Sequence, residues 1–501
     1  MQRKEYERVS PESVGIPSAA VWRMVEALER VAEMHSIMVL RHGKVCAEGW
    51  WSPYGPGVPH GLQSLTKTYA ATAIGLAYTE GLLRLDEKLV DLFPESLPGE
   101  VSENLKKLTI YDVLIMGNGM ESCTLGGADW IKTYFATPVV HEPGTAFFYN
   151  TAGSSMLGAI IKVKTGRSLH AWLSEKLFGK LGIDSRNIGW IRTQDGMEVG
   201  GGGMLATTED NLRLMELYLN GGVWEGERLL AEDFVRMATT KQIDTEEACT
   251  NGPLATDHLL GYGFQMWMCQ PKGAYRADGA FGQYAIVFPE QDMVISLTET
   301  GAADDDGTQR PLDAIYDTIL PALSDGPLPE DPAACAWLCR RMGRLAIARP
   351  PYQPRSPLAA QIDGAVWKVD GGVVYLTPYP LDQLSKKTLT GGIQEFSFHF
   401  GVNRMRMDYL EDGARKSVEV AMDGTRALNV LPNSETPFHK AYLSAYWAEE
   451  HVLRLACRWI ESAYEHTLDF TFDDPTVTIT FRDLIWLRDP ADPTPVTAAR
   501  A

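Results

Sequence analysis

Residues 64–81 read SLTKTYAATAIGLAYTEG, a Ser-x-x-Lys tetrapeptide that runs directly into a helical stretch. The pattern predicts a helix over Thr66–Glu80 that ends at Gly81. Because residues three apart share one face of a helix, Ser64 and Lys67 are expected to lie side by side. A serine hydroxyl is a weak nucleophile at neutral pH, and a neighbouring lysine can act as its base when burial disfavours the charged amine. Taken alone, the spacing is more often a capped, solvated helix start.

The chain around this helix predicts an antiparallel sheet covered by helices, an α+β fold. Early strands, a helical middle and late strands follow one another along the first 325 residues. The hairpin in the early part is expected to turn at His42-Gly43, and Thr207 with Asp210 is a capping box. The expected helices are 18–31, 155–164 and 207–219, and the expected strand pairs are 36–40 with 44–49 and 284–288 with 293–298.

The remainder of the chain has a different pattern, which predicts a second domain. Apolar and polar residues alternate with period two in five short runs, 396–400, 405–409, 418–422, 468–472 and 477–481. Such runs, separated by turns such as Asp423-Gly424, indicate an all-β barrel-like or lipocalin-like domain. We expect the first domain at 1–325, a helical and Pro-rich linker at 326–359 with one helix over Ala333–Ala346, the β domain at 360–488 and a tail at 489–501.

Composition limits the kinds of partner. The 501 residues include 46 Lys+Arg and 65 Asp+Glu, a formal charge of −19, which disfavours nucleic acid and anionic membrane surfaces. Apolar stretches such as Ala70–Tyr78 are far shorter than the roughly 20 residues that span a bilayer. The first 17 residues lack the apolar run of a secretory signal, so a cytoplasmic location is expected.

The seven cysteines are spread thinly over the chain, which is not the pattern of a disulfide framework. Cys335 and Cys339 lie four apart in the expected linker helix. Because no second Cys/His pair lies at zinc spacing, buried structural thiols are the favoured interpretation, and no metal is expected.

Two further motifs follow the Ser-x-x-Lys sequence. Phe148–Thr151 reads FYNT after Pro143-Gly144-Thr145, and Arg276–Tyr284 reads RADGAFGQY just before the late strand pair. In this order the motifs resemble those of class C β-lactamases and penicillin-binding-protein-like serine hydrolases, a family that also includes esterases and D-aminopeptidases. That family has Ser-x-x-Lys, then Tyr-x-Asn or Tyr-x-Ser, then a late Lys/His-x-Gly strand. The resemblance covers roughly Ser10–Leu320.

The resemblance implies roles for individual residues. Ser64 would be the nucleophile that accepts the acyl group, and Lys67 its desolvated partner. Tyr149 would shuttle the proton between nucleophile, lysine and leaving group. The backbone N–H groups of Ser64 and Ala280, the latter just after Gly279, would form the oxyanion hole. Without the resemblance, Tyr149 would be taken for an ordinary packed aromatic.

The chain departs from the family pattern in two places. Thr151 stands where the family usually has Asn or Ser, so a hydroxyl replaces amide geometry. Ala277-Asp278-Gly279 stands where Lys/His-x-Gly is expected, so the cation that would hold a substrate carboxylate is missing. Arg276 is adjacent, but strand alternation would direct it to the opposite face. These departures do not affect the prediction of acyl transfer, because Ser64, Lys67 and Tyr149 are present. They argue against β-lactam hydrolysis and D-Ala-D-Ala carboxypeptidase activity, which need recognition of a carboxylate.

Other residues give weaker signals. The absence of G-x-S-x-G disfavours an α/β-hydrolase, and Gly200–Gly203 is expected to be a loop near the wall of the site rather than a phosphate cradle. His60 is four residues before Ser64, and a structural role is favoured for it. The tryptophans that could wall an acyl pocket, with core packing favoured for most, are Trp50, Trp51, Trp130 and Trp267.

The sequence thus predicts a serine hydrolase that cleaves a small ester, amide or short peptide through an acyl-enzyme. No metal or cofactor is expected, and the sequence is compatible with a homo-oligomer. Three alternatives remain: a β-lactamase or D-amino-acid peptidase, an acylated sensor without turnover, and an inactive scaffold whose β domain binds a partner. We expect the β domain to pack near the mouth of the site and to restrict substrate size.

Overall fold

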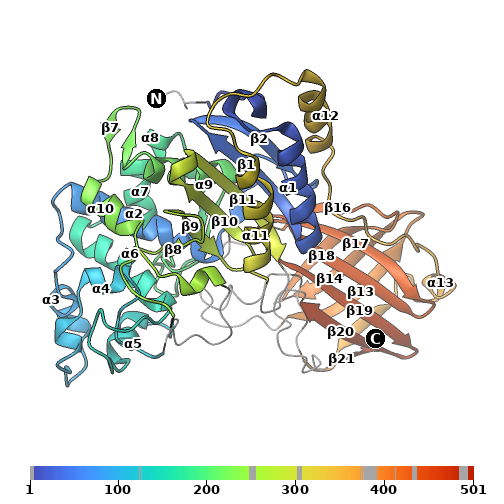
Figure 1. Ribbon diagram of the computed structural model, residues 1–501. Helices are drawn as coiled ribbons and strands as arrows, with labels where there is room; N and C mark the ends of the chain where they lie inside the picture. Colours follow the sequence, from blue (N-terminus) through green and yellow to red (C-terminus); the bar gives the residue numbers. More distant parts are fainter. Residues whose placement is uncertain are drawn as a thin grey trace. The chain divides into compact units, whose positions relative to one another are not determined.

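The computed structural model describes residues 5–122, 124–125, 127–246, 256–301, 307–372, 374, 376, 392–411, 413–431, 437–483 and 495–501. The chain folds as two units, Met1–Ile347 and Ala348–Ala501 (Figure 1). This division lies inside the segment that the sequence suggested as a linker. Helix α12 (Pro332–Met342), expected to extend to Ala346, belongs to the first unit, where Leu338 and Met342 are buried.

The first unit is built around an antiparallel sheet with the strand order β2-β1-β11-β10-β9-β8. Strand β1 pairs with β11, so residues near the start and the end of the unit lie side by side, with Ile37 opposite Leu297. The bounds are β1 Ala32–Arg41, β2 Lys44–Trp50, β8 Trp267–Met268, β9 Tyr275–Gly279, β10 Gln283–Phe288 and β11 Met293–Gly301.

The hairpin of β1 and β2 forms where the sequence predicts it. Both turn residues have positive φ, 53° at His42 and 69° at Gly43, which the tight turn of a two-residue hairpin requires. Successive side chains of β1 point to opposite faces of the sheet. Met38 and Leu40 join the core that the sheet shares with the helical region, whereas Ile37 and Val39 are buried on the other face.

Helices cover both faces of this sheet (Figure 1). Helix α1 (Ser18–Val31), with the bounds that its amphipathic pattern predicts, packs beside α11 (Gln309–Thr318). Helix α9 (Thr208–Leu219) packs on β1, β10 and β11 and begins with the predicted capping box of Thr207 and Asp210.

The helical region beside the sheet centres on α2 (Thr66–Thr79) and α6 (Thr151–Thr165). Every residue from Thr66 to Ala77 is buried, as expected for a helix that is apolar on all sides. The sequence placed the start of α6 at Ser155, which is wrong. The Asn150 side chain accepts a hydrogen bond from the Gly153 N–H (2.8 Å), and this cap starts the helix one turn earlier.

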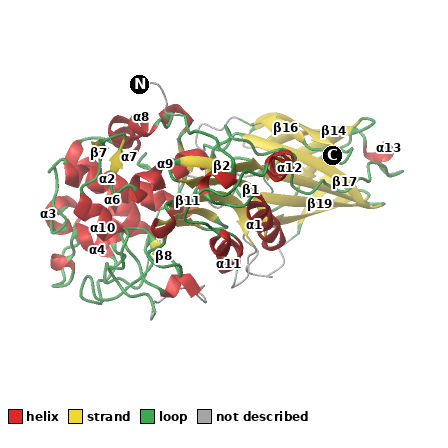
Figure 2. Cartoon of the chain, turned by 45° about the horizontal axis from the view of Figure 1, so that its top comes forward, coloured by secondary structure: helices red, strands yellow, loops and turns green. Residues whose placement is uncertain are grey.

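Short elements complete the first unit. They are α3 Leu89–Leu92, α4 Ile110–Leu114, α5 Trp130–Ala136, α7 Leu169–Leu173, α8 Gly179–Leu181, α10 Glu232–Ala238, β3 His60–Gly61, β4 Gly189–Trp190, β5 Met204–Ala206, β6 Val223–Trp224 and β7 Glu227–Arg228. In Figure 2 the helices of the molecule gather almost entirely in this unit.

The second unit is a closed β-barrel in which neighbouring strands pair antiparallel, except for the parallel closing pair of β15 and β17. Neighbours pair in the order β15-β14-β13-β12-β21-β20-β19-β18-β17, and Ala421 of β15 opposite Ser444 of β17 closes the ring. Strand β16 pairs beside β17. The bounds are α13 Ala359–Ile362, β12 Val366–Val369, β13 Ile393–Phe400, β14 Arg404–Glu411, β15 Ala414–Ala421, β16 Ala427–Val430, β17 Lys440–Glu449, β18 Val452–Trp459, β19 Glu465–Asp473, β20 Thr476–Asp483 and β21 Val496–Arg500.

The period-two runs form the barrel wall, as the sequence predicts. In β14, Met405 and Met407 are buried while Arg404 and Arg406 are exposed. Residues expected to form a C-terminal tail include β21, which pairs with both β12 and β20. The α+β fold with a C-terminal β-barrel is therefore confirmed. In the part of the chain that the structure describes, no helix is long and apolar enough to cross a membrane.

The expectation of buried thiols at Cys335 and Cys339 is wrong. Cys335 is partly exposed and Cys339 is exposed, because α12 lies at the surface and buries a different stripe, Leu338 and Met342. The thiols of Cys46, Cys269 and Cys457 are buried. Cys123 and Cys249 lie outside the described residues.

Candidate active site

Ser64 lies in a single 3-10 turn, Gln63–Leu65, that leads into α2. The residue before it, Gln63, has a φ of 50°, a left-handed conformation that costs energy for a residue with a side chain. Backbone strain of this kind is found at functional sites when the surrounding structure holds it in place. The turn presents Ser64, which is partly exposed, at the start of a buried helix.

Lys67 joins two separate parts of the chain at this point. Its Nζ donates a hydrogen bond to Ser64 Oγ (2.8 Å) and another to the Gly201 carbonyl oxygen (2.5 Å). The Lys67 side chain is about as buried as a core residue, with 1% exposed. Burial disfavours the charged form of an amine, and contact with the serine oxygen is the geometry that proton transfer requires.

Tyr149 lies on the other side of the Lys67 amine. The Nζ atom is 4.7 Å from the centre of the Tyr149 ring. The ring stacks on Trp267 of β8 at a centroid distance of 5.8 Å and an interplanar angle of 15°, and Tyr262 meets it edge-on. The structure thus brings together Ser64, Lys67 and Tyr149, the three residues that the motifs singled out.

The glycine loop 200–203 forms part of this site. The Gly201 N–H donates to Ser155 Oγ (3.1 Å) while its carbonyl accepts from Lys67. A Cβ at Gly201 would lie 2.4 Å from the Thr151 carbonyl oxygen, so only glycine fits between α6 and the lysine. Thr151 is the first residue of α6, and its side chain lies against this loop.

The turn between β9 and β10 packs against the segment that carries Ser64. A Cβ at Gly279 would lie 2.1 Å from the Leu62 carbonyl oxygen, so the backbones touch there. Phe281 and Gly282 have φ values of 69° and 87°, which reverse the chain tightly. Ala280 lies exposed in this turn, between the end of β9 at Gly279 and Phe281.

Arg276 does not replace the missing cation at Ala277. Its guanidinium is fully buried, 2.8 Å from Asp278 and 3.6 Å from Asp257. Burial raises the pKa of the Asp278 carboxyl, but the charges and hydrogen bonds of Arg276 and His258 together outweigh it and hold that pKa below its usual range. Arg276 and Asp278 lie on one face of β9 and Ala277 lies on the other, as the strand alternation predicts.

His258 also contacts Asp278, with its Nε2 3.4 Å from a carboxylate oxygen. Burial lowers the pKa of His258. The His258 ring lies 4.2 Å from the Trp267 ring, on which Tyr149 stacks. Trp267 therefore lies between the candidate proton-transfer residue and a buried charged cluster.

The other candidate residues lie in structural positions. His60 is buried and its Nε2 is 3.0 Å from Nδ1 of the buried His35. Trp51 and Trp130 are buried, and Trp50 is partly exposed on β2. Among the residues that the structure describes, no group of three or more His, Cys, Asp or Glu side chains could hold a metal ion.

Gln265 joins the helices of the site by hydrogen bonds, a role that no sequence motif indicates. Its side chain donates to the Val113 and Leu114 carbonyls of α4 (3.1 and 2.8 Å) and accepts from Ser154 of α6 (2.7 Å). Its own carbonyl accepts from Thr68 of α2 (2.9 Å). The sequence around Gln265 matches no motif, so this role is visible only in the folded structure.

Glu299 lies behind the β9–β10 turn and is fully buried. Neither carboxylate oxygen has a hydrogen-bond partner among the described residues, and a Cβ at Gly282 would lie on this carboxyl group. Burial raises the pKa of Glu299 well above its usual range. Burial without a hydrogen-bond partner among the described residues thus favours the neutral form of this carboxyl group.

This burial predicts a pH-dependent stability. Because the pKa of Glu299 is higher in the folded chain than in the unfolded chain, this group contributes its full stabilisation at pH values below the unfolded pKa. That contribution to the free energy of unfolding is lost as the pH rises through the folded pKa. Glu299→Gln is expected to flatten the fall in the free energy of unfolding above about pH 5, by up to about 1.4 kcal/mol per pH unit. Urea unfolding of both chains from pH 5 to 8 measures this. Parallel profiles would refute it.

Comparisons with known proteins show which family the chain belongs to. The Beta-lactamase family model matches residues 30–317. The 6-aminohexanoate-dimer hydrolase of Paenarthrobacter ureafaciens is 26% identical over 300 residues, 55% of this chain and 76% of that protein. Penicillin-binding protein 4 of Amycolatopsis lactamdurans is 24% identical over 278 residues, 48% of this chain and 71% of that protein.

Among solved structures, the octameric penicillin-binding protein homologue from Pyrococcus abyssi covers 96% of this chain and 98% of its own, at 16% identity and a TM-score of 0.45. The matched residues make up more than half of the chain, and the three sequence motifs lie within them. The chain therefore belongs to the Beta-lactamase family, as the order of its motifs predicted.

Proposed function

We propose that this protein is a serine hydrolase that cleaves small esters or amides through an acyl-enzyme. The observation that carries the proposal is the position of Lys67 Nζ, in hydrogen-bond contact with Ser64 Oγ and directly beside the Tyr149 ring. A buried amine in this position can accept the serine proton and return it.

The proposed reaction begins when Ser64 Oγ attacks the substrate carbonyl carbon and its proton passes to Lys67 Nζ. The backbone N–H groups of Ser64 and Ala280 would stabilise the oxyanion. The tetrahedral intermediate then collapses, the bond to the leaving group breaks, and the leaving group takes a proton relayed through Tyr149. Water attacks the acyl carbonyl carbon, and its proton passes through the same groups to Ser64 Oγ as the acyl–Oγ bond breaks, which releases the acid and restores the serine. Every step uses only groups of the chain and water.

The residues at the third motif limit the class of substrate that we propose. A carboxylate-recognising site needs an accessible cation, and the motif position that would supply it is the fully buried Ala277. Arg276 is occupied by Asp278 and Asp257. Because nothing at this strand position favours a substrate carboxylate, we propose a linear ester or amide in preference to a β-lactam. The name of the related 6-aminohexanoate-dimer hydrolase supports an amide.

A substrate panel tests the proposal. We expect steady-state release of p-nitrophenol from p-nitrophenyl acetate and butyrate, and turnover of linear anilides whose acyl group has no free amine, such as butyryl-p-nitroanilide. We expect little turnover of nitrocefin or of the amino-acid anilide D-Ala-p-nitroanilide. Faster turnover of nitrocefin would favour a β-lactamase, and faster turnover of D-Ala-p-nitroanilide would favour a D-amino-acid peptidase. A stoichiometric burst without a steady state would identify an acylated sensor, and no labelling by a fluorophosphonate would identify an inactive scaffold.

The stacking of Tyr149 on Trp267 gives a further prediction. Trp267→Leu removes the flat surface that orients the tyrosine ring, so kcat for p-nitrophenyl butyrate is expected to fall about tenfold with KM little changed. Trp267→Phe keeps a stacking partner and is expected to retain most of the rate. Thermal unfolding of both variants controls for stability. Equal kcat values for Trp267→Leu and the parent chain would exclude this role.

A further inference from the structure

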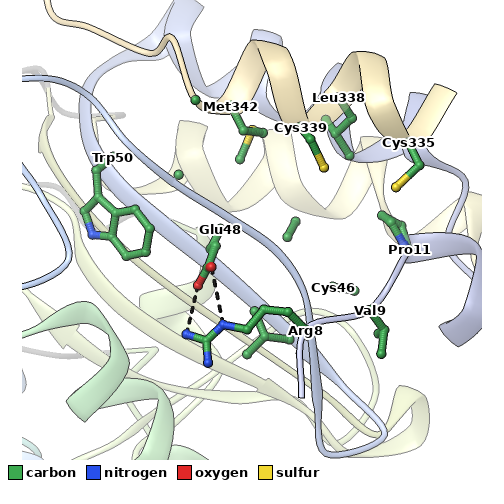
Figure 3. Close-up of a pocket in the computed structure, with 14 residues that line it drawn as sticks. Arg8, Val9, Pro11, Cys46, Glu48, Trp50, Cys335, Leu338, Cys339 and Met342 are labelled. Carbon is green, nitrogen blue, oxygen red and sulfur yellow. Dashed lines mark hydrogen bonds and ion pairs between the residues drawn. The ribbon is translucent and has the colours of Figure 1, made fainter. Parts of the chain in front are cut away.

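A cavity of about 520 Å³ lies in the first unit, at the free side of the edge strand β2. Its walls are β2, the N-terminal segment around Val9 and helix α12 (Figure 3). The N-terminal segment pairs with Val45, and the chain after α12 pairs with Ser52. The cavity fills the interval between these two pairings, where α12 crosses the strand.

The walls of this cavity are mainly apolar. The apolar side chains that line it are Val9, Pro11, Val45, Trp50, Leu338 and Met342. The charged residues at its edge, Arg8 and Glu48, bind each other at 3.2 and 3.3 Å (Figure 3). A ligand for this cavity therefore needs an apolar body of modest size.

Two thiols face the cavity from α12. Cys335 and Cys339 are one helical turn apart, and Figure 3 shows both sulfur atoms on the side of the helix turned toward the cavity. Burial, together with the neighbouring Cys339 thiol, raises the pKa of Cys335. Helix α12 is fixed at its start by Asp331, whose side chain accepts the Ala334 N–H (2.9 Å). The pair is therefore presented by a regular, capped helix.

The geometry of a helix limits what such a pair can bind. Side chains one turn apart have Cβ atoms about 5–6 Å apart, whereas a disulfide holds them at about 3.5–4.5 Å. A direct sulfur–sulfur bond would therefore distort the helix. A structural zinc ion needs four ligands, and no third metal-binding side chain joins the two thiols in the described part of the chain. A single thiophilic atom that bridges two sulfurs satisfies both limits.

We propose that Cys335 and Cys339 form a dithiol site for a trivalent organoarsenical, with arsenic bridging the two sulfurs and its one apolar substituent in the cavity. Each As–OH group condenses with one thiol: an As–S bond forms, and the hydroxyl leaves as water with the thiol proton. Arsenic keeps its oxidation state, so no oxidant or reductant takes part. The inference is independent of the proposed hydrolase activity.

A third cysteine that lines the cavity, Cys46, is separate from the Cys335–Cys339 pair. Cys46 lies on β2, and its Sγ donates to the Val39 carbonyl (3.6 Å) in the sheet. Burial raises the pKa of this thiol to about 12. The bridging chemistry therefore belongs to α12, and Cys46 contributes only to the wall.

The test exposes the full, folded chain to phenylarsine oxide and then to excess 2-mercaptoethanol, which removes arsenic from isolated thiols. Intact mass is expected to show one adduct per chain, equal to one phenylarsine oxide less one water, released by 1,2-ethanedithiol. Cys335→Ser and Cys339→Ser, each of which leaves an isolated thiol, are expected to lose the adduct. Cys46→Ala is expected to keep it. Circular dichroism confirms the fold of each variant.

A second arm tests the cavity itself. Phenylarsine oxide is expected to bind at least about tenfold more tightly than inorganic arsenite, because its ring is removed from water. Ala47→Leu, which fills the cavity from β2, is expected to abolish this preference while leaving the dithiol intact. An adduct that persists in either serine variant, or none on the parent chain, overturns the site. Equal affinities for the two arsenicals overturn the role of the cavity.

Discussion

Ser64→Ala is expected to lower kcat for p-nitrophenyl butyrate by about 10⁴–10⁶-fold, the range found when the nucleophile of a serine hydrolase is removed. The hydroxyl is the atom that Lys67 Nζ contacts, at 2.8 Å, so its removal takes away both the attacking oxygen and the group that the amine would deprotonate. The fluorophosphonate label is expected to disappear together with turnover. Initial rates and intact mass measure the two effects.

The control for this substitution is Ser13→Ala. Ser13 is an exposed serine whose hydroxyl donates only to the Ser10 carbonyl within its own turn, and its loss is expected to leave the rate unchanged. Retention of activity in the Ser64→Ala chain to within tenfold of the parent would show that another group is the nucleophile.

Lys67→Met is expected to reduce kcat by about 10²–10⁴-fold, the usual contribution of a positioned acid or base. Methionine fills much of the same buried space, so the loss of the proton acceptor dominates. The variant also leaves the Gly201 carbonyl without its donor, so its thermal midpoint is to be measured alongside the rate. The rate of fluorophosphonate labelling is expected to fall in parallel, because it depends on the same activation of Ser64.

Lys272→Met is the matched control, because this lysine is exposed and pairs only with a surface glutamate in the β9–β10 half of the sheet. Its expected rate is that of the parent chain. A Lys67→Met chain that is folded and hydrolyses the ester at the parental rate would remove Lys67 from the mechanism.

Local patterns allowed much of the fold to be predicted. The bounds of α1 and the turn at His42-Gly43 depend on periodicity and turn chemistry within a few residues. The order of strands in the sheet was not predictable, since β1 pairs with β11 from the far end of the unit. The start of α6 was misplaced because a capping asparagine inside a motif was not recognised as a cap.

Some features of the candidate site could likewise be predicted from local sequence, and others could not. Ser64 and Lys67 are close because of helical spacing, which the sequence states directly. The Gly201 carbonyl and Trp267 reach the site only through tertiary packing. The exposure of Cys339 depends on which stripe of α12 packs, and a short helix of mixed composition does not specify that stripe. The role of the β-barrel as a filter of substrate size stays a prediction.

The proposed mechanism depends most on Ser64 as the residue that carries the acyl group. The most direct measurement is peptide mapping by mass spectrometry after acid quenching of the full chain during turnover of p-nitrophenyl butyrate. We predict a butyryl group on tryptic peptide 45–67, localised to Ser64 by fragmentation. A butyryl group on a different residue, or steady turnover with no covalent adduct at any time, would contradict the proposed mechanism.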